Sequence, residues 1–178
     1  MVFTAPNNKP SKDEYPELYS STERYPFELS SWQLWTILSL MQGKNALTCA
    51  PTGSGKTLAA DWAIEYYVKS KGKKVIYCSP IKALSNYMKY DFVNQHPDIS
   101  FGIITGDQKD NPDADCIICT TECLRNYLFT SENDAETTTL DFNMNIKDDV
   151  GIIIYDEAHY FNDKDRGEVW ESCFIKQP

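Results

Sequence analysis

The sequence predicts an α/β fold in which helices cover both faces of a parallel β-sheet, and three observations support this prediction. First, strand-like and helix-like segments alternate from Phe27 onward in a chain of 178 residues, which is typical of parallel sheets with crossover helices. Second, a glycine-rich loop at residues 50–57 joins a predicted strand to a predicted helix. Third, residues 150–155 form an aliphatic run, as expected for a central strand buried on both faces.

The spacing of apolar residues defines the individual elements. Helices are predicted where apolar residues recur at helical spacing, in the segments 31–43, 58–72, 81–95 and 121–129. Strands are predicted from short apolar runs, in the segments 45–50, 73–79, 99–105, 114–119 and 150–155. Ser30 or Ser31 can cap the start of the first helix, and Gly43 can end it.

Composition and charge exclude several classes of protein. The net charge of −9 argues against a generic basic nucleic-acid coat, although a channel built from a few local donors stays possible. No apolar run is long enough for a transmembrane helix, so no membrane partner is expected. The N-terminus has no apolar core of a signal peptide. We therefore expect an intracellular protein, cytoplasmic or nuclear and not secreted, whose 6 cysteines are free thiols.

Two segments lack the regular pattern of the rest. Residues 1–26 are rich in proline, serine, tyrosine and charge, which predicts an extended N-terminal arm held by tyrosines that pack on the body. Residues 27–178 then form one predicted domain. Within it, residues 130–149 are polar and acidic without periodicity, which predicts a long loop. Such loops are functional or mobile, and a solvated insertion is the plainer interpretation.

The loop APTGSGKT at residues 50–57 has the composition of a phosphate-binding loop. Gly53 and Gly55 allow backbone N–H groups to turn towards one point, and the N-terminus of the following helix adds positive potential. Lys56 supplies a cation for the β- and γ-phosphates, and the hydroxyl of Thr57 is a hard ligand for Mg²⁺. Ala50 stands where the general pattern has glycine. The expected nucleotide-binding residues of this loop are Pro51, Thr52, Gly53, Ser54, Gly55, Lys56 and Thr57.

A second candidate site lies at the end of the aliphatic strand, in the segment IIIYDEAH at residues 152–159. In open parallel sheets, ligands bind at the carboxyl ends of the strands. Asp156 can hold the Mg²⁺ shell, and Glu157 can orient and deprotonate the attacking water. His159 can sense the γ-phosphate or a second domain, or it can simply cap or pack. We expect Lys56, Asp156, Glu157 and His159 to form the catalytic set.

The order of the segments APTGSGKT, SPIKALSN, TGD, TTECLR and DEAH resembles the first RecA-like domain of a superfamily 2 helicase. Longer phrases are similar to the superkiller-type RNA helicases that serve the RNA exosome, and they lie at residues 79–92, 105–128 and 155–171. The resemblance covers residues 27–178. It implies a RecA-like P-loop NTPase fold, ATP and Mg²⁺ as cofactors, and RNA that is single-stranded or carries a 3′ overhang.

The resemblance also implies roles for individual positions. Gln33, with Phe27 upstream, matches the adenine-recognition element, and a side-chain amide offers the donor and acceptor that adenine requires. Other positions match the turns that hold the RNA backbone, where amides, hydroxyls and cations meet phosphates. These expected RNA-binding residues are Pro80, Lys82, Ala83, Ser85, Gly106, Asp107, Thr120, Thr121 and Arg125. For Arg125, a plain helix salt bridge is the alternative.

The chain departs from the resembling family at several points. Ala158 stands where the family often has valine, which leaves the carboxylates in place. Tyr87 and Met88 replace the usual Gln-Lys pair, which puts a direct role for these two positions in doubt. The acidic segment 130–149 is longer than in typical members.

The resemblance implies a second RecA-like domain that supplies arginine fingers, and this chain ends before it. We therefore expect a fragment or natural truncation that binds nucleotide but is nearly inactive alone. The parent would be an ATP-dependent helicase that translocates on and unwinds RNA, with RNA-degradation machinery as an implied partner. Two alternatives stay open: a DNA-directed superfamily 2 helicase, and a non-catalytic RecA-like binding module.

The segment CIICTTEC at residues 116–123 looks at first like part of a metal site. Cys116 and Cys119 lie on a predicted strand, where residues three apart point to opposite faces. Cys123 falls on the next helix, and neither histidine is near in sequence. We therefore expect no zinc and interpret the cysteines as small buried hydrophobic residues.

Overall fold

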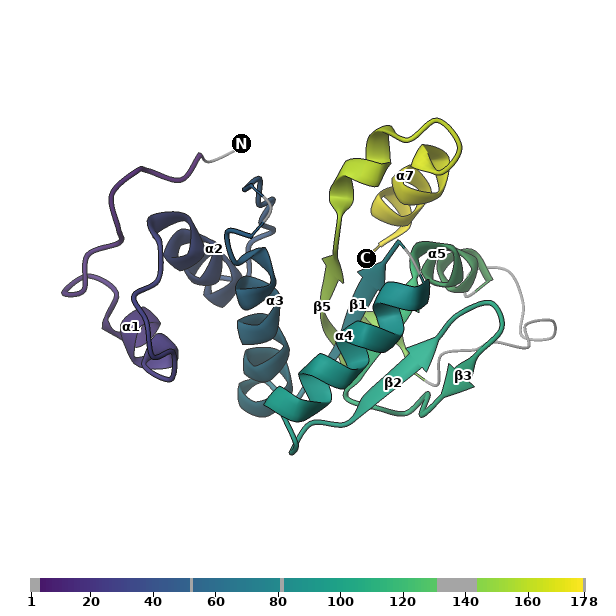
Figure 1. Ribbon diagram of the computed structural model, residues 1–178, viewed down its shortest axis with the longest axis horizontal. Coiled ribbons are helices and arrows are strands. Elements are labelled where there is room, and N and C mark those ends of the chain that lie inside the picture. The colour runs from purple at the N-terminus through teal and green to yellow at the C-terminus, as the bar shows by residue number, and fades with distance from the viewer. Residues whose placement is uncertain (1–3, 52, 81, 131–143, 178) are drawn as a thin grey trace. The chain divides into compact units, whose positions relative to one another are not determined.

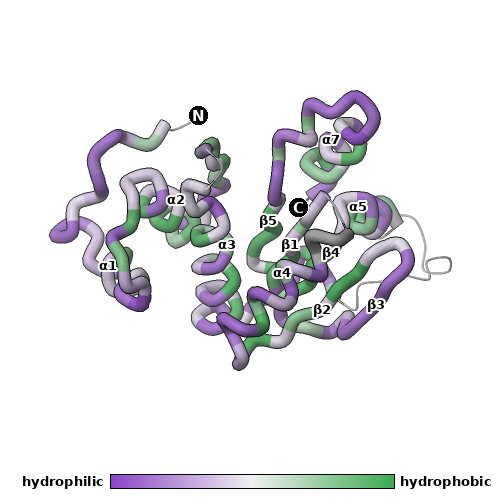
Figure 2. Tube along the Cα trace, in the orientation of Figure 1, coloured by the Kyte–Doolittle hydropathy of each residue, from purple (hydrophilic) through white to green (hydrophobic). Residues whose placement is uncertain are grey.

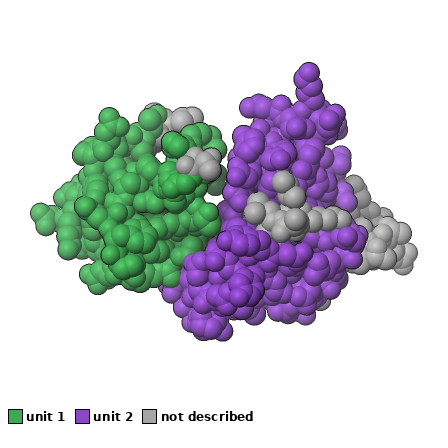
Figure 3. Space-filling model, viewed as in Figure 1, with its two compact units in different colours: residues 1–63 green, residues 64–178 purple. Residues whose placement is uncertain are grey.

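The computed structural model describes residues 4–51, 53–80, 82–130 and 144–177. The chain divides into two compact units, residues 1–63 and 64–178 (Figure 3). Each unit is described by itself below. No helix in the described ranges is long and apolar enough to cross a membrane.

The first unit is helical, with α1 (Pro16–Thr22), α2 (Ser31–Met41) and α3 (Lys56–Glu65), the last of which runs past the division (Figure 1). α1 corrects the prediction of an extended arm. Pro16 begins this helix, where its missing N–H costs nothing, and Leu18 buries its side chain. One tyrosine of this segment does pack on the rest of the unit, because the rings of Tyr15 and Trp35 of α2 lie edge to face with centroids 6.4 Å apart.

α2 begins and ends as its sequence predicts. Ser30 and Gln33 form a capping box at its N-terminus, which satisfies backbone N–H groups that the first turn leaves free. Gly43 follows the helix with φ +69°, a left-handed conformation that glycine adopts at no steric cost.

The predicted strand at residues 45–50 is absent from the structure. This segment has no regular secondary structure, and Leu47 is 83% exposed. A strand exists only through the hydrogen bonds of a neighbour, and in the described part of the chain this segment belongs to no sheet.

The second unit is built on a 5-stranded sheet with the order β3-β2-β4-β1-β5. Its strands are β1 (Lys74–Ser79), β2 (Phe101–Ile104), β3 (Lys109–Asp110), β4 (Cys116–Thr120) and β5 (Val150–Tyr155). The pairs among β2, β4, β1 and β5 are parallel as predicted, whereas β3 pairs antiparallel with β2. The sheet is therefore mixed, because the short turn after β2 sends the chain straight back along the same strand.

Helices pack on the two faces of this sheet. On one face, Phe92 of α4 (Lys82–Gln95) packs edge-on against Tyr77 and stacks on Phe101. On the other, α5 (Thr121–Thr130) and α7 (Gly167–Lys176) cover a core that includes Cys78 and Leu124. β2, which carries Phe101, is coloured mainly as hydrophobic in Figure 2. The remaining elements are η1 (Tyr66–Ser70), α6 (Ile146–Asp149) and η2 (Ala158–Asn162).

β5 lies at the edge of the sheet, which corrects the prediction of a central strand buried on both faces. Each of its residues is partly exposed. The aliphatic run therefore identified the strand but not its position in the sheet, because that position depends on which strands pair with one another. The predicted loop at 130–149 lies mostly outside the described residues, and its end forms α6.

Candidate functional site

The glycine loop at residues 50–57 belongs to the first unit, and its two glycines adopt left-handed backbone. Gly53 and Gly55 adopt φ values of +78° and +83°, in the left-handed region that side chains disfavour. Lys56 and Thr57 begin α3, with Thr57 exposed to solvent. The Lys56 ammonium donates to the carbonyl of Ala50 at 2.9 Å. The predicted loop residue Thr52 lies outside the described residues.

Gln33 links the start of α2 to this loop. Its side-chain oxygen accepts hydrogen bonds from the backbone N–H and the hydroxyl of Ser30, at 2.8 and 2.9 Å. Its Nε2 donates to the carbonyl of Gly55 at 3.2 Å. Gln33 is buried, while Phe27 is 56% exposed. The adenine contact expected of these two residues stays a prediction, and the structure adds a loop-holding contact for Gln33.

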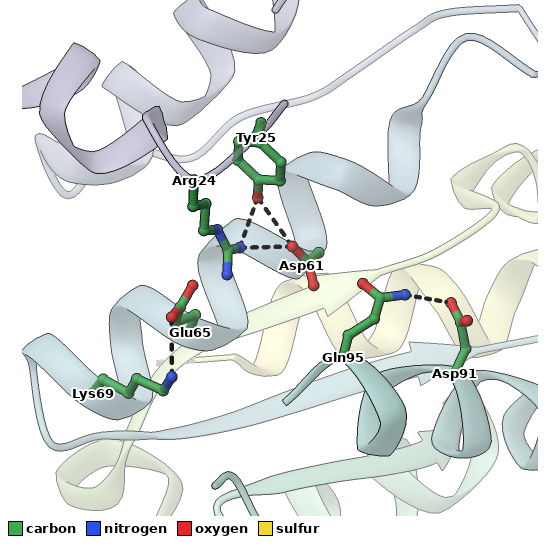
Figure 4. Close-up of polar contacts among 7 residues, drawn as sticks. All are labelled: Arg24, Tyr25, Asp61, Glu65, Lys69, Asp91 and Gln95. Atoms are coloured by element: carbon green, nitrogen blue, oxygen red, sulfur yellow. Dashed lines mark hydrogen bonds and ion pairs between the residues drawn. The ribbon is translucent and has the colours of Figure 1, made fainter. Parts of the chain in front are cut away.

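A polar cluster ties the segment after α1 to α3 (Figure 4). The guanidinium of Arg24 and the hydroxyl of Tyr25 both donate to Oδ2 of Asp61, at 2.6 and 3.0 Å. Burial raises the pKa of Tyr25, and the Asp61 charge raises it further. Asp61 lies one turn after Thr57, so this cluster anchors the helix that carries the predicted phosphate-binding residues.

The carboxylate pair of the second unit follows directly after β5. Asp156 Oδ1 accepts from the Glu157 N–H at 2.9 Å, and Oδ2 accepts from the Tyr77 hydroxyl at 2.8 Å. Glu157 adopts φ +53°, a left-handed conformation that is strained for a side-chain-bearing residue. His159 Nδ1 lies 3.1 Å from a carboxylate oxygen of Glu157. Asp156, Glu157 and His159 thus lie together after β5, and the catalytic role expected of them and of Lys56 stays a prediction.

The residues expected to hold an RNA backbone lie at turns of the second unit. Pro80 is buried directly after β1, and the side chains of Lys82, Ala83 and Ser85 lie outside what the structure describes. Gly106 and Asp107 are exposed in the turn between β2 and β3, where Thr105 donates its hydroxyl to Asp107 at 2.8 Å.

The turn from β4 into α5 is more enclosed than its sequence suggested. Thr120 and Thr121 are both buried, and the Thr120 hydroxyl donates to the sulfur of Cys123 at 3.3 Å. Thr121 Oγ1 has no hydrogen-bond partner among the described residues. Arg125 lies over the ring of Phe129 at 5.5 Å. Of these three predicted RNA contacts, only Arg125 is partly exposed, and all three stay predictions.

The cysteines behave as buried thiols in the second unit. All 6 cysteines of the chain are free, as predicted. The sulfur of Cys119 lies 3.6 Å from the sulfur of Cys78, which is its register partner on β1. Cys116 belongs to the opposite face of the sheet. Burial raises the pKa of both Cys78 and Cys116. Within the described ranges, no group of three or more His, Cys, Asp or Glu side chains could hold a metal ion.

A family model for the DEAD/DEAH box helicases matches residues 30–177. The chain belongs to this family. It is 40% identical over 167 residues to the antiviral helicase SKI2 of Saccharomyces cerevisiae, covering 93% of this chain and 12% of that protein. It is 34% identical over 173 residues to the human exosome RNA helicase MTR4, covering 95% of this chain and 15% of that protein. These relatives confirm the superkiller-type resemblance, and the chain spans a small part of their length.

Solved structures agree on the fold. The chain matches the crystal structure of a hypothetical ATP-dependent RNA helicase from Sulfolobus tokodaii with a TM-score of 0.59 and 19% identity. That match covers 90% of this chain and 46% of the other. It also matches the DUF1998 helicase MrfA bound to DNA, with a TM-score of 0.52, 19% identity and coverage of 69% of this chain and 19% of that one. The α/β class with a helix-flanked sheet is therefore confirmed.

Tyr77 is the residue of the site that the sequence did not reveal. Its only signal is that it is the one aromatic residue in the strand KVIYCS, and a buried tyrosine hydroxyl usually has a partner. The sequence does not show which partner, because Tyr77 and Asp156 lie 79 residues apart.

Proposed function

We propose that this chain supplies the ATP-binding part of an ATP-dependent RNA helicase. The main support is that this chain of the DEAD/DEAH box family has two features in the described residues. A loop with two left-handed glycines precedes α3, and two carboxylates, of which Asp156 accepts two hydrogen bonds, follow β5. The name of a further relative supports the proposed use of both ATP and RNA. The ATP-dependent RNA helicase mtr4 of Schizosaccharomyces pombe is 37% identical over 154 residues, which are 86% of this chain and 12% of that protein.

The first unit would hold the nucleotide. The backbone N–H groups around Gly53 and Gly55 and the N-terminus of α3 favour the triphosphate. The Lys56 ammonium, bonded to a backbone carbonyl in the structure, would bond the β- and γ-phosphates instead. Gln33 and Phe27 would contact adenine, and the bond from Gln33 to Gly55 would make the loop conformation depend on that contact.

The second unit would supply the hydrolytic groups. Glu157 would accept the proton of a water whose oxygen attacks the γ-phosphorus while the bond to the β–γ bridging oxygen breaks. His159, at 3.1 Å from the Glu157 carboxylate, would hold that carboxylate in place and respond to the γ-phosphate. The partly exposed carboxylate of Asp156 is held by its two hydrogen bonds.

Mg²⁺ fits the donors that this chain offers. The exposed hydroxyl of Thr57 and the partly exposed carboxylate of Asp156 are hard oxygen ligands, and Mg²⁺ is commonly held by one or two such groups together with substrate phosphates. Each of them, Thr57 in the first unit and Asp156 in the second, therefore stays a predicted ligand of the ion. When bound, the ion neutralises negative charge on the phosphates.

RNA would be held through its backbone. Arg125 is the partly exposed cation of the α5 turn, and Gly106 and Asp107 form an exposed turn nearby in sequence. Lys82 would add a second cation, and Pro80, Ala83, Ser85, Thr120 and Thr121 would complete the two turns. Contacts of this kind bind without sequence preference and weaken with salt. A second RecA-like domain would supply the other half of the groove and the arginine fingers, which are worth about 10³–10⁵ in rate.

Nucleotide binding and turnover test this proposal. The chain should bind a fluorescent ATP analogue weakly in the presence of Mg²⁺, and Lys56→Ala should remove that binding. Hydrolysis by the chain alone should be negligible, and a turnover of about one per second that Lys56→Ala abolishes would contradict this expectation.

The same experiments, repeated on a longer protein that contains this chain and a second RecA-like domain, separate the alternatives. RNA should stimulate its ATPase more than DNA of the same sequence, and the reverse result would favour a DNA-directed helicase. Unchanged nucleotide binding in Lys56→Ala, with no stimulated hydrolysis, would favour a non-catalytic binding module.

A further inference from the structure

We infer that Tyr77 is a positioning residue that orients the Asp156 carboxylate towards the metal ion that binds with the nucleotide. This inference rests on the proposed role of Asp156 and adds a residue to it. The Tyr77 hydroxyl donates to Asp156 Oδ2 at 2.8 Å. Both residues belong to the second unit, so the contact lies within one compact part of the chain.

Strand register places the two side chains on the same face of the sheet. β1 and β5 are parallel, and Tyr77 lies opposite Ile154. Side chains two residues apart on a strand share a face, so Asp156 follows Ile154 on the face of Tyr77. The long tyrosine side chain spans this offset and brings its hydroxyl to the carboxyl end of β5, where ligands bind in open sheets.

Packing holds the Tyr77 ring in one orientation. Tyr77 is 1% exposed. The ring of Phe92 packs against it at 5.4 Å with an interplanar angle of 69°, and Phe92 is itself stacked on Phe101. Because close-packed interiors leave side chains few rotamers, the hydroxyl has little freedom to point elsewhere. A tyrosine hydroxyl is protonated at neutral pH, and here it donates to Asp156 Oδ2.

The two donors act on different oxygens of Asp156. Tyr77 donates to Oδ2 and the Glu157 N–H donates to Oδ1, while the Asp156 N–H donates to the Cys78 carbonyl at 2.9 Å. The carboxylate therefore cannot rotate without breaking one of these bonds, and each oxygen keeps a lone pair for another partner. Groups that orient a metal-binding carboxylate in this way typically change metal affinity or activity about 10–100-fold when removed.

Manganese binding provides a test that does not depend on turnover. Mn²⁺ would be titrated into the chain with a non-hydrolysable ATP analogue, and free Mn²⁺ would be followed by electron paramagnetic resonance. Tyr77→Phe removes one oxygen and keeps the buried ring. We expect it to weaken nucleotide-dependent Mn²⁺ binding about 10–100-fold.

Tyr155→Phe is the matched control. Tyr155 immediately precedes Asp156, and its hydroxyl bonds Gln177 at 3.3 Å. Its ring stacks on Phe174 of α7, on the opposite face of the sheet. Tyr155→Phe should leave Mn²⁺ binding unchanged. An equal loss in both variants would mean general damage to β5 and would overturn the inference.

Asp156→Asn separates this inference from the proposed function. Loss of Mn²⁺ binding in Asp156→Asn together with wild-type binding in Tyr77→Phe would refute the role of Tyr77 and leave Asp156 in place. Wild-type binding in Asp156→Asn would refute the proposed role of Asp156 itself. If the inference holds, Tyr77→Phe should add no further loss in the Asp156→Asn background, because the two residues then act as one unit.

Discussion

Phe92 packs on the face of the sheet on which Tyr77 and Asp156 lie. Replacing Phe92 with alanine should strongly destabilise the second unit. Phe92 is 0% exposed and contacts two aromatic rings. Burial of an aromatic side chain of roughly 150–250 Å² is worth about 4–6 kcal/mol at about 25 cal/mol per Å², which is an upper value. Alanine keeps the first carbon, so Phe92→Ala should lower the free energy of unfolding by about 3–5 kcal/mol.

Thermal unfolding followed by near-ultraviolet circular dichroism measures this change. For a chain of this size, about 1 kcal/mol corresponds to about 2–4 °C in Tm, so the midpoint should fall by about 6–20 °C. Val93→Ala is the matched control, because Val93 is the next residue on α4 and is 42% exposed. Its effect should stay within about 0.5 kcal/mol. A Phe92→Ala midpoint no lower than that of Val93→Ala would refute the packing described for this face.

Two further predictions concern the stability of the second unit. Gly102→Ala should destabilise it by about 1–3 kcal/mol, because the added methyl would lie 2.2 Å from the Asn111 carbonyl oxygen. Gly106→Ala is the control, since its methyl would meet nothing within 4 Å. Equal urea midpoints for the two variants would contradict this prediction. The free energy of unfolding should fall between about pH 8 and about pH 10. Buried Cys78 and Cys116 have raised pKa values, so they keep their thiol protons in the folded chain. In the unfolded chain the same thiols lose their protons above about pH 8.5. Each thiol contributes about 1.4 kcal/mol per pH unit there, so Cys116→Ala should show a shallower fall in urea midpoints, and an identical slope would count against this assignment.

Local features of the chain were predictable because their causes are local. Ser30 and Gln33 cap α2 within a few residues of each other, and the glycines of the loop at residues 50–57 adopt left-handed backbone just before α3 begins. Caps, turns and apolar periodicity depend only on neighbouring residues. The helices α2, α4 and α5 and the strands β1, β2 and β4 therefore lie where the sequence predicted them.

Strand neighbours were not predictable because they depend on residues far away in the chain. The aliphatic composition of β5 suggested a central strand, but its edge position follows from which strands pair. The segment 45–50 has strand-like composition and belongs to no sheet in the described residues. Composition measures how well a segment would suit a sheet and contains no information about its partner.

By itself, the sequence determined which residues are proposed for the chemistry of this protein: a lysine and a threonine at the start of a helix, and two carboxylates at the end of a strand. Only the tertiary structure decided how those carboxylates are held. The bond between Tyr77 and Asp156 joins residues 79 apart, and it exists because β1 and β5 pair in parallel at one particular register. A shift of that register by one residue would turn Tyr77 to the other face, so the contact follows from strand pairing that no local pattern specifies.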